Sequence, residues 1–211
     1  MSDSEIISQG HDHRPNTGGL PRELHRRTSG ADPRPPALWS ARDTFRPDGP
    51  PGVWGAYPKG FTSWAARVLC AQPDAILHVC SGGLPAGIGR CRVDIRAAAV
   101  PDVVADGRTL PFRDRVFDAV MIDPPYTTEY AADLYGTEYP RPSHLLSEAA
   151  RVVKPCGRVG ILHFLVPMPP PGCRLVDVRG VTTGCGYRIR AFTVFERGQD
   201  ELFAPPTEPG P

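Results

Sequence analysis

The chain has 211 residues, of which 40% are hydrophobic and 22% charged, a composition that suits one globular domain with a sizeable core. Its 24 basic and 23 acidic residues give a net charge of +1, so overall charge does not indicate a nucleic-acid binder. No apolar run approaches the roughly 18 residues of a membrane-spanning helix, and the first residues lack the apolar centre of a signal peptide. We therefore expect a cytoplasmic protein that has no membrane partner.

The six cysteines are scattered along the chain without a Cys-x-x-Cys pair. This spacing favours neither a zinc site nor a dense disulfide framework. We expect reduced, mostly structural thiols and no metal site.

Proline marks the ends of the expected domain, because its 26 copies cluster rather than spread. Residues 1–50 combine proline with Gly, Ser and charged residues and lack a periodic apolar pattern, which predicts a flexible arm. Residues 199–211 have the same character and predict a flexible tail. The domain itself is expected to span residues 51–198.

Between these tails, helical and strand patterns alternate. Residues 60–70 have apolar side chains at helical spacing, with Thr62 or Ser63 available as the N-cap. Short apolar runs that are typical of buried strands follow at residues 75–80, 91–95, 102–105, 116–122 and 158–164.

The second half of the domain adds a helix and a hairpin. Residues 143–153 predict an amphipathic helix, which Pro155 and Gly157 should end. Residues 174–179 and 187–196 predict a terminal antiparallel pair of strands. The sum is an α/β fold with an open, mostly parallel sheet and an antiparallel edge, in which ligands bind outside the carboxyl ends of the strands.

Asp123-Pro124-Pro125-Tyr126 is the most informative segment, because it directly follows the apolar strand at 116–122. Two prolines fix the backbone, so one turn can hold a carboxylate, a carbonyl without competing N–H groups, and an aromatic ring. Hydrogen bonds from an exocyclic amine to Asp123 and to the Pro124 carbonyl would return electron density to the amine nitrogen, and Tyr126 could stack on the acceptor ring. The alternative is a proline-bent loop with an incidental acid.

Asp-Pro-Pro-Tyr after an apolar strand resembles the hallmark of amino-methyltransferases of the class I S-adenosylmethionine fold, chiefly those that modify adenine at N6 or cytosine at N4 in DNA. The resemblance covers about residues 55–197. It implies a Rossmann-like sheet with a reversed last strand, S-adenosyl-L-methionine as the cofactor, and DNA or RNA as the partner. It also implies a catalytic site formed by Asp123, Pro124, Pro125 and Tyr126.

The resemblance places part of the cofactor site after the first two strands of the sheet. Cys80, Ser81, Gly82 and Gly83 are similar to the family's glycine turn, which approaches the methionine portion of the cofactor. The family usually has an acidic residue where this chain has Cys80. Asp94, at the end of the next strand, matches the carboxylate that accepts the ribose hydroxyls.

Two further segments complete the implied cofactor site. Asp106 and Gly107 match the position that reads the amino group of the cofactor's adenine, and Leu110 would wall the ring. Lys59 and Phe61 are similar to the segment whose aromatic side chain and backbone contact the methionine end of the cofactor.

The connections at residues 83–93 and 95–103 are too short for the usual helices, so these crossovers should be abbreviated. Residues 127–142 form the only insertion beside the expected site; their tyrosines could stack on bases or fold a lid, and we favour the lid. Arg188 and Arg190 alternate on the last strand and either face phosphate or form a solvated strand face.

The acceptor is the least determined part of the hypothesis, because the chain has no separate region for reading a DNA site. Adenine N6 in DNA is the favoured acceptor. The alternatives are RNA, a small-molecule amine, or a non-catalytic cofactor-binding subunit that needs a partner protein for target recognition.

Overall fold

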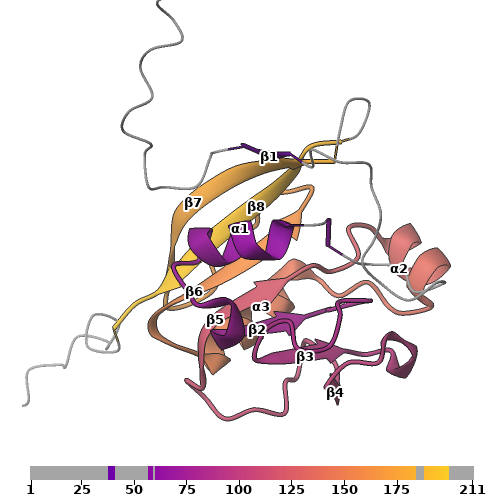
Figure 1. Cartoon of the computed structure of the whole chain (residues 1–211), viewed down its shortest axis with the longest axis horizontal. Helices are drawn as coiled ribbons and strands as arrows, with labels where there is room; N and C mark the ends of the chain where they lie inside the picture. Colours follow the sequence, from indigo (N-terminus) through magenta and orange to yellow (C-terminus); the bar gives the residue numbers. More distant parts are fainter. Residues whose placement is uncertain (1–37, 41–56, 59, 184–187, 200–211) are drawn as a thin grey trace, which may run out of the picture. The chain divides into compact units, whose positions relative to one another are not determined.

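The computed structural model describes residues 38–40, 57–58, 60–183 and 188–199, all of which belong to the segment 34–211 (Figure 1). Of the predicted arm, only Leu38–Ser40 is described, and of the predicted tail only Gln199. Lys59 lies outside the described residues. In the part of the chain that is described, no helix has the length and apolarity needed to cross a membrane.

One sheet organises the described residues. Its strands are β1 (Leu38–Ser40), β2 (Ile76–Val79), β3 (Cys91–Asp94), β4 (Val103–Val104), β5 (Phe117–Ile122), β6 (Val153–His163), β7 (Cys173–Thr182) and β8 (Arg190–Arg197). Their order across the sheet is β1-β7-β8-β6-β5-β2-β3-β4. Strands β4, β3, β2, β5 and β6 are parallel, whereas β8 runs antiparallel to both β6 and β7. The predicted fold class, including the terminal antiparallel pair, is confirmed.

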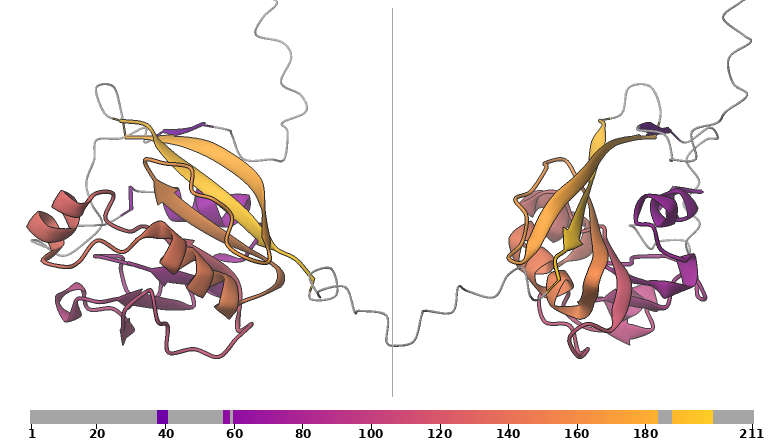
Figure 2. Two further views of the ribbon diagram at one scale, coloured as in Figure 1. Left: turned by 180° about the vertical axis from the view of Figure 1, so that it is seen from behind. Right: turned by 90° about the vertical axis from the view of Figure 1, so that its left-hand side faces the viewer.

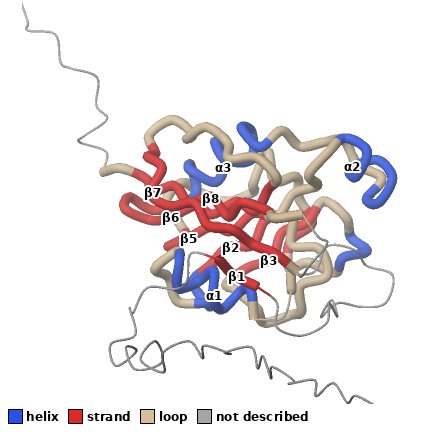
Figure 3. Tube along the Cα trace, turned by 90° about the horizontal axis from the view of Figure 1, so that it is seen from above, coloured by secondary structure: helices blue, strands red, loops and turns tan. Residues whose placement is uncertain are grey.

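Helices cover both faces of this sheet, as Figures 2 and 3 show. On one face, α1 (Phe61–Val68) packs its apolar side on alternate residues of β2, β5, β6 and β8. On the other face, α3 (Pro142–Val152) packs on the intervening residues of the same strands. The strands therefore contribute to a core on each side, which explains why they read as continuous apolar runs in the sequence.

The structure corrects two details of the helix ends. Gly60, with a φ of +82°, is the N-cap of α1, and neither Thr62 nor Ser63 caps the helix. Helix α3 ends at Val152, before Pro155 and Gly157, which lie within β6 where its pairing with β5 shifts register. A bulge in a strand, rather than a helix stop, accommodates these two residues.

The abbreviated crossovers are confirmed. No helix connects β2 to β3, and only the 3₁₀ turn Ala97–Ala99 lies between β3 and β4. Buried Arg92 holds the first connection by donating a hydrogen bond to the carbonyl of Leu84 over 2.6 Å, and it pairs with Asp102 at 2.7 Å. A buried arginine, paired with an exposed aspartate, therefore anchors a segment that a helix would otherwise cover.

Strand β1 was not expected from the sequence. Leu38–Ser40 lies within the predicted arm and pairs in parallel with residues 180–182 of β7. Three residues are too few to produce a recognisable strand pattern, and their pairing depends on an edge that only the folded sheet provides.

Candidate active site

The carboxyl ends of four neighbouring parallel strands bring the main predicted residues together. Gly82 follows β2, Asp94 ends β3, Asp106 follows β4 and Asp123 follows β5. All four line one cavity of about 480 Å³. The predicted Cys80, Gly107 and Pro125 line the same cavity. This is the sheet edge at which ligands bind in open α/β folds.

The insertion after β5 forms the opposite wall of the cavity. It contains α2 (Thr128–Tyr135), capped by the Thr127 side chain, which accepts a hydrogen bond from the Tyr130 amide over 3.2 Å. Tyr135 and the loop residues Gly136, Thr137, Glu138 and Pro140 line the cavity. Tyr130 is exposed and Tyr139 contacts His163 at 3.3 Å. One tyrosine of the three thus reaches the cavity, and the lid interpretation of this segment remains a prediction.

Asp94 is held rigidly at the cavity wall. Its Oδ2 accepts a hydrogen bond from the Gly82 amide over 2.8 Å, and its Oδ1 accepts from the Arg96 amide at 2.9 Å and from Arg96 Nε at 3.2 Å. A carboxylate has about four lone-pair sites, so these three bonds leave one for a ligand hydroxyl.

Asp106 accepts more hydrogen bonds from the protein than Asp94 does. Arg108 donates to it from Nε and Nη2, at distances down to 2.7 Å, and from its backbone amide at 2.8 Å. These hydrogen bonds hold the pKa of Asp106 below its usual value. Arg108 also reaches Glu138 at 3.3 Å, which joins the loop after β4 to the insertion. A ligand that bonds to Asp106 must displace one donor of Arg108.

Asp123 has a different environment. The Tyr126 hydroxyl donates to its Oδ1 over 2.7 Å, and Arg190 Nη1 donates to the Tyr126 oxygen over 3.1 Å. Among the residues that the structure describes, Oδ2 of Asp123 has no hydrogen-bond partner. Burial raises the pKa of Asp123 to about 6, against the opposing effects of the Arg190 charge and the Tyr126 hydrogen bond.

The ring of Tyr126 is occupied by protein neighbours. It packs against Phe164, with centroids 4.6 Å apart, and edge-on against His163 at 5.6 Å. Stacking of Tyr126 on an acceptor remains a prediction, while its hydroxyl contact with Asp123 is a feature that the sequence did not reveal. The solvated-face interpretation is wrong for Arg190, which is half-buried against Tyr126. Arg188 is exposed, with its guanidinium 5.4 Å from the Phe164 ring centroid.

Cys80 lines the cavity at the turn after β2. It adopts a left-handed conformation with φ of +54°. Burial, reinforced by the charges of Asp94 and Asp123, raises the pKa of its thiol well above the usual value. The side chain is therefore a neutral thiol in the cavity wall.

The remaining predicted residues do not line the cavity. Phe61 is fully buried, stacked on Tyr57 with ring centroids 5.4 Å apart. Ser81 and Leu110 are buried beside the cavity, and the Ser81 Oγ has no hydrogen-bond partner in the described structure. Gly83 and Pro124 shape the turns that carry Gly82 and Asp123 but are absent from the cavity lining. Their predicted roles in binding and catalysis remain predictions.

Two further residues interact with Asp123: Tyr57, which no sequence pattern singled out, and Arg190, whose inward orientation the sequence left open. Tyr57 is 4% exposed, its hydroxyl lacks a partner among the described residues, and burial together with the Asp123 charge raises its pKa. Arg190 stands at the start of an apolar strand, and an arginine followed by Ala-Phe-Thr-Val-Phe was the available signal for an inward-facing charge. No three His, Cys, Asp or Glu side chains of the described residues are grouped to hold a metal ion.

The chain resembles known proteins over part of its length. No family model matches the chain. Over 71 residues it is 42% identical to a demethylmenaquinone methyltransferase of Corynebacterium efficiens and 39% identical to that of Corynebacterium urealyticum. In both cases the match covers 34% of this chain and 26% of the relative, so the chain spans about a quarter of the length of these relatives.

Solved structures of methyltransferases resemble the described domain at low identity. TrmN from Thermus thermophilus has a TM-score of 0.46 and 21% identity, over 64% of this chain and 48% of that one. A putative methyltransferase from Bacillus halodurans has a TM-score of 0.43 and 12% identity, over 65% and 99% of the two chains. The sheet of this protein, with β8 reversed between β6 and β7, is of the class I methyltransferase type.

Proposed function

We propose that this protein is an S-adenosylmethionine-dependent methyltransferase whose acceptor is an exocyclic amino nitrogen. The observation that carries the proposal is the position of Asp123. Its carboxylate, with one oxygen unpartnered among the described residues, lines the cavity that also contains Gly82, Asp94 and Asp106. A group that binds an acceptor thus lies at the same cavity as the groups that would hold a methyl donor.

The residues of the cavity fit the donor. A volume of about 480 Å³ lies within the usual range for cofactor sites. Asp94 retains one lone pair for a ribose hydroxyl, and the Gly82 turn carries no side chain that would block close approach of the donor. Asp106 would bind the adenine amino group after a shift of Arg108. When bound, the donor supplies a methyl group on a sulfonium, which is a strong electrophile.

Asp123 would orient the acceptor and take up its proton. Oδ2 accepts a hydrogen bond from the amine, which directs the nitrogen lone pair toward the cavity and increases electron density on the nitrogen. Transfer of the methyl group would break its bond to sulfur, leave the donor as a neutral thioether and make the acceptor nitrogen cationic, a charge that the ionised Asp123 carboxylate would stabilise. The nitrogen then releases a proton to Asp123 or to water, so a strong base is unnecessary.

Adenine N6 in DNA is the first acceptor to test. The Asp-Pro-Pro-Tyr segment supports an aromatic amine, and exposed Arg188 beside Phe164 offers a guanidinium and an aromatic surface near Tyr126. This combination suits a base and its neighbouring phosphate. RNA presents the same chemistry, and a partner protein would supply target recognition.

A small apolar acceptor is the second candidate. The segment after β6 and the start of β8 expose several large apolar side chains, namely Leu165, Val166, Met168 and Ile189. The relatives with local identity are named for methylation of demethylmenaquinone, which favours testing an apolar acceptor.

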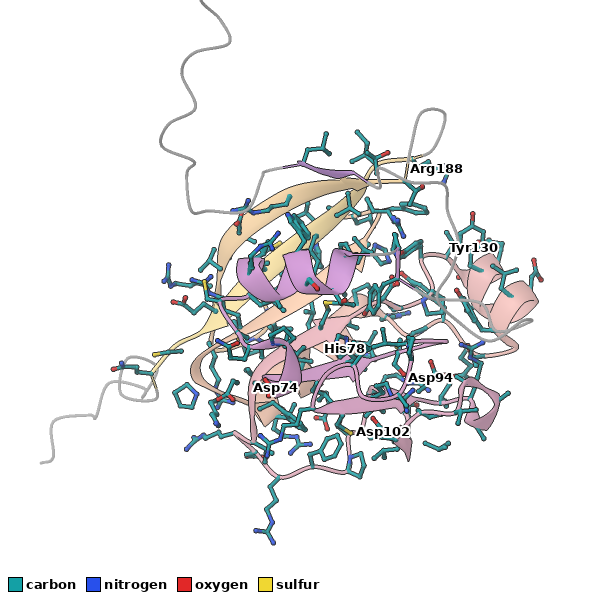
Figure 4. All side chains as sticks on the ribbon, viewed as in Figure 1. Asp74, His78, Asp94, Asp102, Tyr130 and Arg188 are labelled. Atoms are coloured by element: carbon teal, nitrogen blue, oxygen red, sulfur yellow. The ribbon has the colours of Figure 1, made fainter. Side chains whose placement is uncertain are left out.

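The test is transfer of isotope-labelled methyl groups to unmethylated DNA, RNA and a panel of small aromatic acceptors, followed by mass spectrometry of the products. The variant Asp123→Ala should lose at least about a hundredfold in rate while still binding S-adenosylhomocysteine. Asp74→Ala is the control, because Asp74 is exposed and precedes β2, at the opposite end of that strand from the cavity (Figure 4). Equal transfer by wild type and Asp123→Ala, or no binding of S-adenosylhomocysteine by wild type, would reject the proposal.

A further inference from the structure

We propose that Arg190 is a positioning residue for Asp123: acting through the Tyr126 hydroxyl, it keeps the carboxylate ionised and leaves Oδ2 for the acceptor. This inference rests on the function proposed above for Asp123. It assigns the last strand of the sheet a part in the chemistry.

The topology explains how Arg190 reaches the site. Strands β5 and β6 are parallel, so Asp123 and His163 lie at the same edge of the sheet. Strand β8 runs antiparallel to β6 and pairs Ala191 with His163, which places its first residue, Arg190, at this edge. A parallel last strand would begin at the opposite edge. The reversed strand therefore delivers a cation to the carboxyl ends of the parallel strands.

The direction of the hydrogen bonds is fixed by their donors. A guanidinium can only donate, so the Tyr126 oxygen accepts from Arg190 Nη1 over 3.1 Å. The single proton of the Tyr126 hydroxyl is then available for Asp123 Oδ1, 2.7 Å away. An ionised Asp123 is a strong acceptor for this hydrogen bond, and the Arg190 cation on the other side of the hydroxyl strengthens the bond. The chain from Arg190 to Tyr126 to Asp123 thus favours the carboxylate over the neutral acid.

Arg190 is the charged member of the described groups that interact electrostatically with Asp123. The others are Tyr57 before α1, Cys80 after β2, Tyr126 after β5 and Tyr135 in α2. Burial raises the pKa of all four, so they are neutral near pH 7. His163, which packs edge-on against Tyr126, has its pKa lowered by burial and is neutral as well. The charged residues Asp94, Arg96, Asp106 and Arg108 also line the cavity, but they pair with each other, Asp94 with Arg96 and Asp106 with Arg108. Without Arg190, the half-buried carboxylate of Asp123 would have no cationic partner among the described groups that interact with it.

The two oxygens of Asp123 therefore have different roles. Oδ1 is fixed by Tyr126, which restricts rotation of the carboxylate. Oδ2 keeps its lone pairs for the acceptor amine. Burial favours the neutral acid form of Asp123, whereas the charge of Arg190 favours the carboxylate.

The experiment measures the pKa of Asp123 directly, by the pH dependence of its carboxyl carbon resonance in protein labelled with ¹³C-aspartate; Asp123→Asn assigns the signal. Arg190→Met should raise the pKa by about one pH unit or more, and Tyr126→Phe should raise it as well. Arg190→Lys keeps the charge and should restore part of the wild-type value. Arg174→Met, which removes an exposed arginine of β7 paired with Glu196, should leave it unchanged.

The same variants are compared in the pH profile of methyl transfer. In Arg190→Met the acid limb of kcat/KM should move to higher pH together with the pKa of Asp123. In the double variant with Tyr126→Phe, this pKa should shift by less than the sum of the two single changes. An unchanged pKa in folded Arg190→Met overturns the inference, and if that variant does not fold, an unchanged pKa in Tyr126→Phe does so. If wild type transfers no methyl group but the pKa shifts appear, the positioning of Asp123 stands and the proposed function fails.

Discussion

The amide of Gly82 donates a hydrogen bond to Oδ2 of Asp94 over 2.8 Å, which joins the turn after β2 to the end of β3. The crossover between these strands contains no helix, but the strands pair directly, and the Ser81 amide donates to the Val93 carbonyl over 3.0 Å. The buried hydrogen bond from Gly82 to a charged acceptor adds to these contacts. The floor of the cavity is therefore preorganised although the connection above it is short.

We expect the ionised carboxylate of Asp123 to lower the free energy of unfolding. Its folded pKa of about 6 lies above its ordinary value of 3.8, so the folded state binds more protons than the unfolded chain between these values. Stability from this group is present at about pH 4 and is lost as pH rises toward 6. Asp123→Asn, which keeps an oxygen for the Tyr126 hydroxyl, should therefore be more stable than wild type at pH 8, by about 3 kcal/mol.

Urea unfolding at pH 4, 6 and 8 measures this difference. The gain of Asp123→Asn should grow between pH 4 and pH 6 and then stay constant. Asp118→Asn is the control, because Asp118 is an exposed aspartate paired with Lys154 on the neighbouring strand. A stability difference that does not vary with pH would contradict the prediction.

His78 should impose the opposite pH dependence. It is 2% exposed, its Nδ1 has no hydrogen-bond partner in the described structure, and burial with the nearby Arg92 charge lowers its pKa from 6.5 to about 4. The unfolded chain binds the proton first, so stability is lost as pH falls from about 6.5 to 4, by about 3 kcal/mol. His78→Leu should remove this slope, whatever its constant packing cost.

The measurement is the free energy of unfolding of wild type and His78→Leu at pH 4.5, 5.5 and 7.5. His144→Gln, in which an exposed histidine of α3 is replaced, should retain the wild-type slope. Parallel curves for His78→Leu and wild type would show that His78 does not account for the loss of stability in acid.

Much of the fold could be predicted because strand and helix patterns are local. Runs such as residues 119–122 are apolar throughout, since α1 and α3 cover both faces of the sheet. The ends of elements were less predictable. Pro155 suggests a helix stop in isolation, but the bulge that holds it forms only when β6 pairs with β5.

The residues of the candidate site were likewise predictable only in part. Asp94, Asp106 and Asp123 could be placed because strand order brings the ends of β3, β4 and β5 to one edge. Their partners could not be placed. Whether Arg190 faces solvent or Tyr126 depends on which edge of the sheet the start of β8 reaches, and residue spacing does not contain that information.

Gly107 should be required for packing as well as for access to the cavity. A Cβ at this position would lie 2.7 Å from Val79 Cγ1 and 2.9 Å from Leu145 Cδ2, both in the core beneath α3. Gly107→Ala should therefore lower the free energy of unfolding by about 1–3 kcal/mol. Adding Val79→Ala removes the nearer methyl, so the double variant should lose less than the sum of the single losses. Strict additivity would show that the clash does not occur.

We expect Tyr135 to strengthen binding of the methyl donor, because its side chain forms part of the cavity wall. The Arg96 guanidinium carbon lies 4.7 Å from the centroid of the Tyr135 ring, and Arg96 in turn donates to Asp94. Tyr135→Ala removes this cation–π contact and part of the wall, and should weaken binding of S-adenosylhomocysteine about tenfold, whereas Tyr135→Phe keeps the ring and should bind nearly as wild type. Tyr130→Ala is the matched control, because Tyr130 is exposed on the same helix and does not line the cavity. Calorimetry that gives equal affinities for Tyr135→Ala and Tyr130→Ala would remove α2 from the donor site.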